Sequence, residues 1–152
     1  MIDENNWVIP FKTIINTSAA GAYIVNFPEY RPDLFLFMAR SLGLTYFDFR
    51  TEVMSPYGWD AHQLTIEELD ERLLQEAGKG NLMVCNVEAL LATKETDERK
   101  KWLQDFLSRQ WPKTIVLPLC LYSHEVPEFS TNVYSFENKD LPEQSFVNRL
   151  LM

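Results

Sequence analysis

Short apolar runs alternate with amphipathic stretches along most of the 152-residue chain. From residue 22 onward, runs of about strand length are separated by segments whose apolar residues recur every three or four positions, as on one face of a helix. Several runs are apolar on consecutive residues, which is typical of strands covered by helices on both faces. This alternation predicts an α/β fold, a three-layer αβα sandwich around a mainly parallel sheet of about five strands. The predicted strands cover residues 22–27, 45–50, 81–87, 114–121 and 132–136.

Helices are predicted between and after these strands. The first begins at Pro32, whose fixed φ suits a first helical turn, and ends at Gly43. The second begins at Thr65, which forms a capping box with Glu68. A third covers residues 96–110, and a capping pattern at Asp140 predicts a last one. The residues predicted to face inward are Leu34, Phe37, Met38 and Ser41, then Ile66, Leu69, Leu73 and Ala77, then Trp102, Leu103, Phe106 and Leu107, and finally Phe146, Val147, Leu150 and Leu151.

The chain is long enough for one domain with a substantial core. We expect a single domain over residues 1–152, with an N-terminal arm or short extra strand in 1–20, a core in 22–136 and a C-terminal helix in 140–152. Long loops are predicted at residues 51–63 and 124–131, and long loops in compact domains often carry function. Pro118 predicts that the fourth strand bends or ends early, because proline cannot donate a hydrogen bond to a neighbouring strand.

Composition narrows the possible functions. The chain is 46% hydrophobic and 13% aromatic, which predicts a packed core rather than disorder. A net charge of −8 and a pI near 4.7 disfavour direct binding to nucleic-acid phosphates. No apolar run approaches the roughly 18 to 20 residues that span a bilayer, and the first residues lack a signal-peptide pattern, so we expect no membrane contact and a cytoplasmic location.

The cysteines and histidines are spread along the chain. Cys85 and Cys120 lie in apolar runs, where a buried free thiol is the usual state of a cysteine. His62 and His124 lie in predicted loops, far apart in sequence. Because none of these residues has the short spacing of a metal site, we expect no metal and no cofactor.

The segment from Val25 to Pro32 lies between the first predicted strand and the first helix, where an ATPase carries its phosphate-binding loop. Such a loop needs two glycines that let backbone N–H groups surround the phosphates, followed by Lys and then Ser or Thr. Val25, Tyr30, Arg31 and Pro32 occupy these four positions. Their identities argue against nucleotide hydrolysis.

The order of strands and helices over residues 22–136 resembles the core of the P-loop NTPases, in particular the AAA-type ATPases. In that family the second strand often ends in an acidic residue, and Asp48 is in a similar place. The third strand of family members ends in carboxylates that bind magnesium and activate water. In this chain, Cys85 and Asn86 stand at similar positions. The resemblance implies a P-loop-like domain that lacks the Walker A and Walker B residues. A flavodoxin-like fold also fits the pattern.

Two groups of residues are candidates for a site near the strand ends. Arg31 offers a planar fork to an anion, and the aromatic residues of the long loop offer a recognition patch. Each candidate also has a purely structural interpretation. Arg31 could be an exposed partner of Glu29 and Asp33, Glu88 could lie in a solvated turn, and the aromatic residues could pack in the core. The candidate anion or partner contacts are Arg31, Tyr30, Glu88, Tyr57 and Trp59, and the candidate acid or base groups are Asp48, Glu88 and His124.

The leading hypothesis is a noncatalytic module that binds another protein, for example an ATPase or a second copy of the chain. An enzyme that uses Asp48, Glu88 or His124 on a small substrate is a second hypothesis. A third is an acidic mimic of nucleic acid that occupies a DNA-binding protein, which follows from the charge alone.

Overall fold

The computed structural model describes residues 6–15, 20–121, 125–127 and 131–143. Its centre is a five-stranded sheet with the strand order β2-β3-β4-β1-β5, and all strand pairs are parallel. This confirms the α/β fold with a parallel sheet. The strands are β1 (Ala22–Asn26), β2 (Thr45–Asp48), β3 (Leu82–Cys85), β4 (Ile115–Leu119) and β5 (Val133–Ser135).

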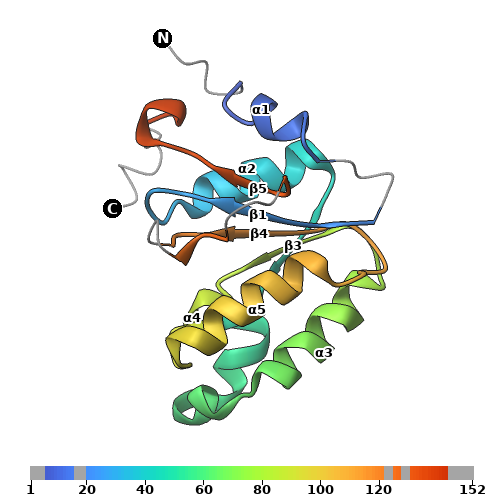
Figure 1. Cartoon of the computed structure of the whole chain (residues 1–152), viewed down its shortest axis with the longest axis vertical. Coiled ribbons are helices and arrows are strands. Elements are labelled where there is room, and N and C mark those ends of the chain that lie inside the picture. Colours follow the sequence, from blue (N-terminus) through green and yellow to red (C-terminus); the bar gives the residue numbers. More distant parts are fainter. Residues whose placement is uncertain (1–5, 16–19, 122–124, 128–130, 144–152) are drawn as a thin grey trace.

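Helices cover both faces of the sheet, as Figure 1 shows. Side chains alternate between two hydrophobic clusters: Ile24, Val84 and Leu117 face α3 to α5, whereas Val25 and Met83 face α1 and α2. The chain is therefore a three-layer sandwich, and its buried strands are apolar on both sides. The helical elements are α1 (Ile9–Lys12), α2 (Pro32–Leu42), η1 (Arg50–Met54), η2 (Ser55–Gln63), α3 (Ile66–Ala77), α4 (Glu88–Leu91), α5 (Thr96–Ser108) and η4 (Asn138–Asp140).

The strand order distinguishes between the two folds that fit the sequence. A flavodoxin-like sheet has the order 2-1-3-4-5, which places the first strand beside the second. Here β1 lies between β4 and β5, and β2 lies at the edge beside β3. The flavodoxin-like alternative is therefore wrong.

The predicted ends of the two central helices are confirmed. Pro32 begins α2, and Gly43 ends it with a left-handed φ of 68°. Thr65 and Glu68 form both hydrogen bonds of the capping box at the start of α3. The inner face of α2 was only partly predicted. Leu34 and Met38 are buried as expected, but the other buried residues are Phe35 and Ala39 instead of Phe37 and Ser41.

Several other predictions need correction. Residues 51–63 do not form an open loop but the π-helical turn η1 and the 3₁₀ segment η2. The strand predicted over 45–50 ends at Asp48, where the chain turns into η1. For residues 1–20 an N-terminal arm or a short extra strand was predicted; within 6–15 the chain forms the short helix α1 and no strand. Of the predicted C-terminal helix, residues 144–152 lie outside the described part of the chain.

Pro118 separates the carboxyl ends of β3 and β4. The carbonyl of Thr114 accepts from Leu82 of β3, so every second residue of β4 from Thr114, including Pro118, directs its backbone toward β3. Proline has no N–H to donate there, and the pairing of β3 with β4 extends only to Met83 and Val116. The register with β1 continues past Pro118 to Leu119. As predicted, the proline ends strand pairing early, but only on one side.

Candidate functional site

Arg31, the first candidate for an anion contact, is paired within the chain. Only 5% of its surface is exposed. Its Nε and Nη2 donate to the two carboxylate oxygens of Asp33 at 3.1 and 3.0 Å, and Nη1 donates to the Pro142 carbonyl at 3.0 Å. The expected pairing with Asp33 is present, but the side chain is buried rather than exposed. Arg31 thus ties the start of α2 to the C-terminal segment.

Asn26 occupies the end of β1 and closes the space between β1 and the chain that follows β4. Its Oδ1 accepts a hydrogen bond from the backbone N–H of Leu121 at 2.7 Å. The N–H of Phe27 donates to the Leu119 carbonyl at 2.7 Å. In a phosphate-binding loop the backbone N–H groups after β1 turn toward an anion. Here the first of them is used within the sheet.

A second polar cluster joins the ends of β2 and β3. Asn86 Nδ2 donates to Asp48 Oδ1 at 2.9 Å, and the N–H of Thr51 donates to the same oxygen at 3.2 Å. Asn86 has a φ of 66°, a left-handed conformation that asparagine tolerates better than most residues. Asn86 therefore ends its strand and binds the acid of the neighbouring strand.

The side chains of Tyr46 and Cys85 are hydrogen-bonded to each other beside this cluster. Burial raises the pKa of the Cys85 thiol to about 12, although the bond from Tyr46 opposes this shift. Burial also raises the pKa of the Tyr46 hydroxyl. Both groups are therefore neutral at physiological pH. A neutral thiol is a poor nucleophile, so this pair has a structural character.

Glu88, the first residue of α4, enters the gap between β3 and β4. Its Oε2 accepts from the N–H of Cys120 at 2.9 Å. Burial raises the pKa of Glu88, the Cys120 hydrogen bond lowers it, and nearby Glu125 raises it further. Glu88 is thus half-buried and hydrogen-bonded instead of solvated in a turn.

Glu88 also lines a pocket of about 230 Å³ between α4, α5 and the chain after β4. Across this pocket, Arg99 forms an ion pair with Glu125 at 3.5 Å. Asp48 is not among the lining residues, so the two carboxylates that were candidates for acid and base chemistry do not share this pocket. The third candidate, His124, lies outside the described residues.

Trp59 and Tyr57 lie in η2, on the α3 and α5 side of the sheet. Trp59 is 95% exposed and Tyr57 is 54% exposed, so neither is a core residue. Between them, Gly58 has φ 57° and ψ −125°, values of the first central residue of a type II′ turn, which favour glycine. The turn presents the indole ring to solvent.

The predicted contact residues do not form one surface. Tyr30 packs its ring edge-on against Phe35, which belongs to the cluster under α2, whereas Ala61 and Leu64 of the Trp59 segment pack on the opposite face of the sheet. Sequence reasoning missed the roles of Asn26 and Asn86. The only local signal was an asparagine at the end of each apolar run, a residue type that is common where strands end in turns.

The described residues show neither a metal centre nor a membrane span. Within them, no group of three or more His, Cys, Asp and Glu side chains is arranged to hold a metal ion. None of the helices in this part of the chain is long and apolar enough to cross a membrane. Both cysteines are free thiols.

Comparisons with protein-family models, curated proteins and solved structures found no match to this chain. The function must therefore be argued from the chain itself. At the strand ends, its polar groups mostly satisfy one another. At the edge of the α3 and α5 layer, it exposes two large aromatic side chains.

Proposed function

We propose that the protein is a noncatalytic α/β module that binds another protein through the surface around Trp59 and Tyr57. The exposure of Trp59 carries this proposal. A buried tryptophan side chain contributes on the order of 150 to 250 Å² of contact area, and tryptophan is among the residues that most often dominate the energy of protein interfaces. Leaving it in water has no benefit for the fold.

The hydrogen bonds made by polar side chains near the carboxyl ends of the strands support a noncatalytic role. Ligands of open α/β sheets bind at the carboxyl ends of the strands. There, Asn26, Arg31, Asp48 and Glu88 are hydrogen-bonded to other parts of the chain. A nucleotide would have to replace these bonds without glycines to approach its phosphates.

We also propose that the chain is an inactive relative of the AAA-type ATPases. The alternation of strands and helices around a parallel sheet, on which the resemblance rests, supports this proposal. The residues at the ends of β1 and β3 explain why such a relative would not hydrolyse nucleotide. On this reading, the fold retains the shape of an ATPase domain while its surface serves for recognition.

Two measurements test this function. Thermal unfolding with millimolar ATP or ADP, with and without magnesium, is expected to show no stabilisation, because only a ligand that binds the folded state raises its melting temperature. A clear upward shift would contradict the noncatalytic reading.

Partner binding is tested with matched variants. A photo-crosslinking residue replaces Tyr57 in the full chain, with and without Trp59→Ala, in cells of the source organism. We expect a discrete crosslinked product that Trp59→Ala abolishes. A crosslinker at Tyr30, which is equally exposed at 54%, is the control on the opposite face. The same products from both positions, or none that depends on Trp59, would refute the proposal.

A further inference from the structure

The segment that carries Trp59 is held firmly against the rest of the α3 and α5 layer. His62 Nδ1 is 2.8 Å from the Trp59 carbonyl, and Lys94 donates to the carbonyls of His62 and Leu64. Ala61 and Leu64 pack into the core beneath. Because Met54 before the turn is also buried in the same core cluster, the turn is anchored on both sides, and little conformational entropy is lost when a partner covers the indole ring.

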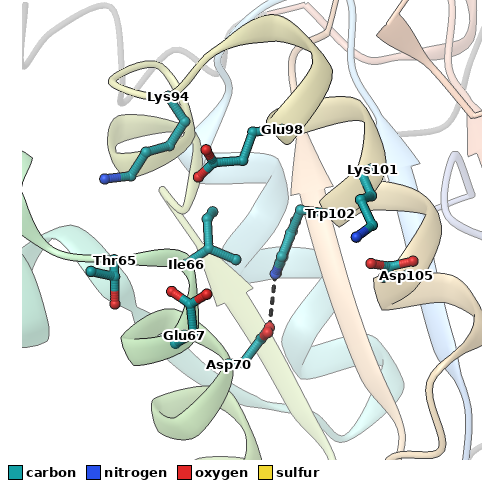
Figure 2. A pocket seen from close by; sticks show the side chains of 9 residues that line it. All are labelled: Thr65, Ile66, Glu67, Asp70, Lys94, Glu98, Lys101, Trp102 and Asp105. Carbon is teal, nitrogen blue, oxygen red and sulfur yellow. Dashed lines mark hydrogen bonds between the residues drawn. The ribbon is translucent and has the colours of Figure 1, made fainter.

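A groove lies next to this segment, between the start of α3 and the outer face of α5. Its volume is about 510 Å³. Lys94 belongs both to its lining and to the contacts that hold η2, so the groove and the Trp59 turn are neighbours. Figure 2 shows Ile66 and the edge of Trp102 between the charged side chains of the two helices. The base of the groove is apolar and its walls are charged.

The charged walls carry four acidic residues and two lysines, Lys94 and Lys101, so their net charge is negative. The Asp70 carboxylate already has partners within the chain, since it accepts a hydrogen bond from Trp102 Nε1 and forms an ion pair with Arg109. Among the described residues, none forms a hydrogen bond or ion pair with the side chains of Glu67, Glu98 or Asp105. In Figure 2 the carboxylates of Glu67 and Glu98 point into the groove from opposite walls. These acids lack partners within this part of the chain.

The region around the turn has the same sign of charge. Residues 48–76 contain eight Asp and Glu residues and two Arg residues, a net charge of −6 out of −8 for the whole chain. Most of the negative charge therefore lies in η1, η2, α3 and the strand end that precedes them. A second copy of the chain would bring the same charge to this surface, and like charges facing each other across an interface are unfavourable.

We infer that the Trp59 turn and the groove between α3 and α5 form one docking surface for a positively charged segment of a partner protein, with Lys or Arg side chains. This inference rests on the proposed protein-binding function and specifies the partner's chemistry. Trp59 and Tyr57 supply the apolar anchor and stack on guanidinium or ammonium groups. The alkyl stems of Lys or Arg pack along Ile66, while their charged ends meet Glu67 and Glu98.

A random peptide library displayed on phage tests this inference. The library is selected on the immobilised full-length chain and counter-selected on the Trp59→Ala chain. We expect the enriched peptides to carry net positive charge together with a large apolar residue. Labelled synthetic copies are then titrated against the wild type, Trp59→Ala, a Glu67→Gln/Glu98→Gln variant and a Glu29→Gln/Glu137→Gln control that removes the same charge elsewhere.

Trp59→Ala is expected to weaken binding by roughly tenfold or more, as for a central interface residue. The Glu67→Gln/Glu98→Gln variant should weaken it more than the control does, and added salt should weaken binding to the wild type. Enriched peptides that depend on Trp59 but are neutral or acidic would overturn the inference and leave the protein-binding function standing. Enrichment of no Trp59-dependent peptide, or self-association through Trp59 in sedimentation, would also overturn it.

Discussion

Replacement of Arg31 by alanine is expected to destabilise the fold, because the guanidinium serves the structure and not an anion. The substitution removes two hydrogen bonds to Asp33 and one to the Pro142 carbonyl. Loss of one member of a buried ion pair costs about 3 to 5 kcal/mol. The Asp33 side chain is 23% exposed and regains water when Arg31 is lost, so we expect a cost at or below the lower end of this range, about 2 to 3 kcal/mol.

Urea unfolding followed by far-ultraviolet circular dichroism measures this change. With a slope of roughly 2 kcal/mol per molar urea, the midpoint of Arg31→Ala should fall by about 1 to 1.5 M. Arg40→Ala is the matched control, since Arg40 is an exposed arginine on the same helix and should shift the free energy of unfolding by less than about 0.5 kcal/mol. Equal midpoints for the two variants would show that the pairing of Arg31 does not stabilise the protein.

Three further predictions concern Glu88, the thiols and Trp59. Because burial raises the pKa of Glu88 in the folded chain above its ordinary value of 4.5, the folded state binds the proton more tightly, and stability falls as pH rises from about 4.5 through the raised pKa. Glu88→Gln keeps an acceptor for the Cys120 N–H, so its stability relative to wild type should increase with pH across that window in chemical unfolding, and a pH-independent difference would contradict this. Since burial raises the pKa of both the Cys85 and Cys120 thiols to about 12, a disulfide reagent at neutral pH should react slowly with the native chain and rapidly with both thiols in urea, whereas fast native reaction would exclude these environments. Acrylamide should quench mainly the emission of Trp59, so Trp59→Phe should remove most of the quenchable fluorescence, and strong residual quenching would mean that a second tryptophan is exposed. The other tryptophans, at 3 to 5% exposure, are Trp7, Trp102 and Trp111.

Local sequence patterns were sufficient for the fold class and for the ends of the central helices. Thr65 and Glu68 cap α3 through groups only three positions apart, and Gly43 ends α2 through its own left-handed backbone. Consecutive apolar residues in β3 and β4 reflect helices on both faces of the sheet. These features depend on residues within one or two turns of each other, so they can be read along the chain.

Residues 49–64 show where prediction from local sequence patterns fails. Pro56 and Gly58 are typical loop residues, yet the segment forms helical turns because Met54 and Leu64 are drawn into the core beside α4. Its aromatic residues could equally have been buried. Their exposure was decided by the position of the turn at the sheet edge, which packing determines.

The sequence by itself determined that the chain forms an α/β domain and that the segment between β1 and α2 lacks the glycines and lysine of a phosphate-binding loop. Only the tertiary structure decided the strand order, the burial of Arg31 against Pro142 and the closure of the space at Asn26 by Leu121. The bonds of Arg31 and Asn26 join residues 111 and 95 positions apart. Periodicity and capping encode neighbours along the chain, whereas partners at such separations are selected only when the whole sheet is assembled and buried polar groups must find hydrogen bonds.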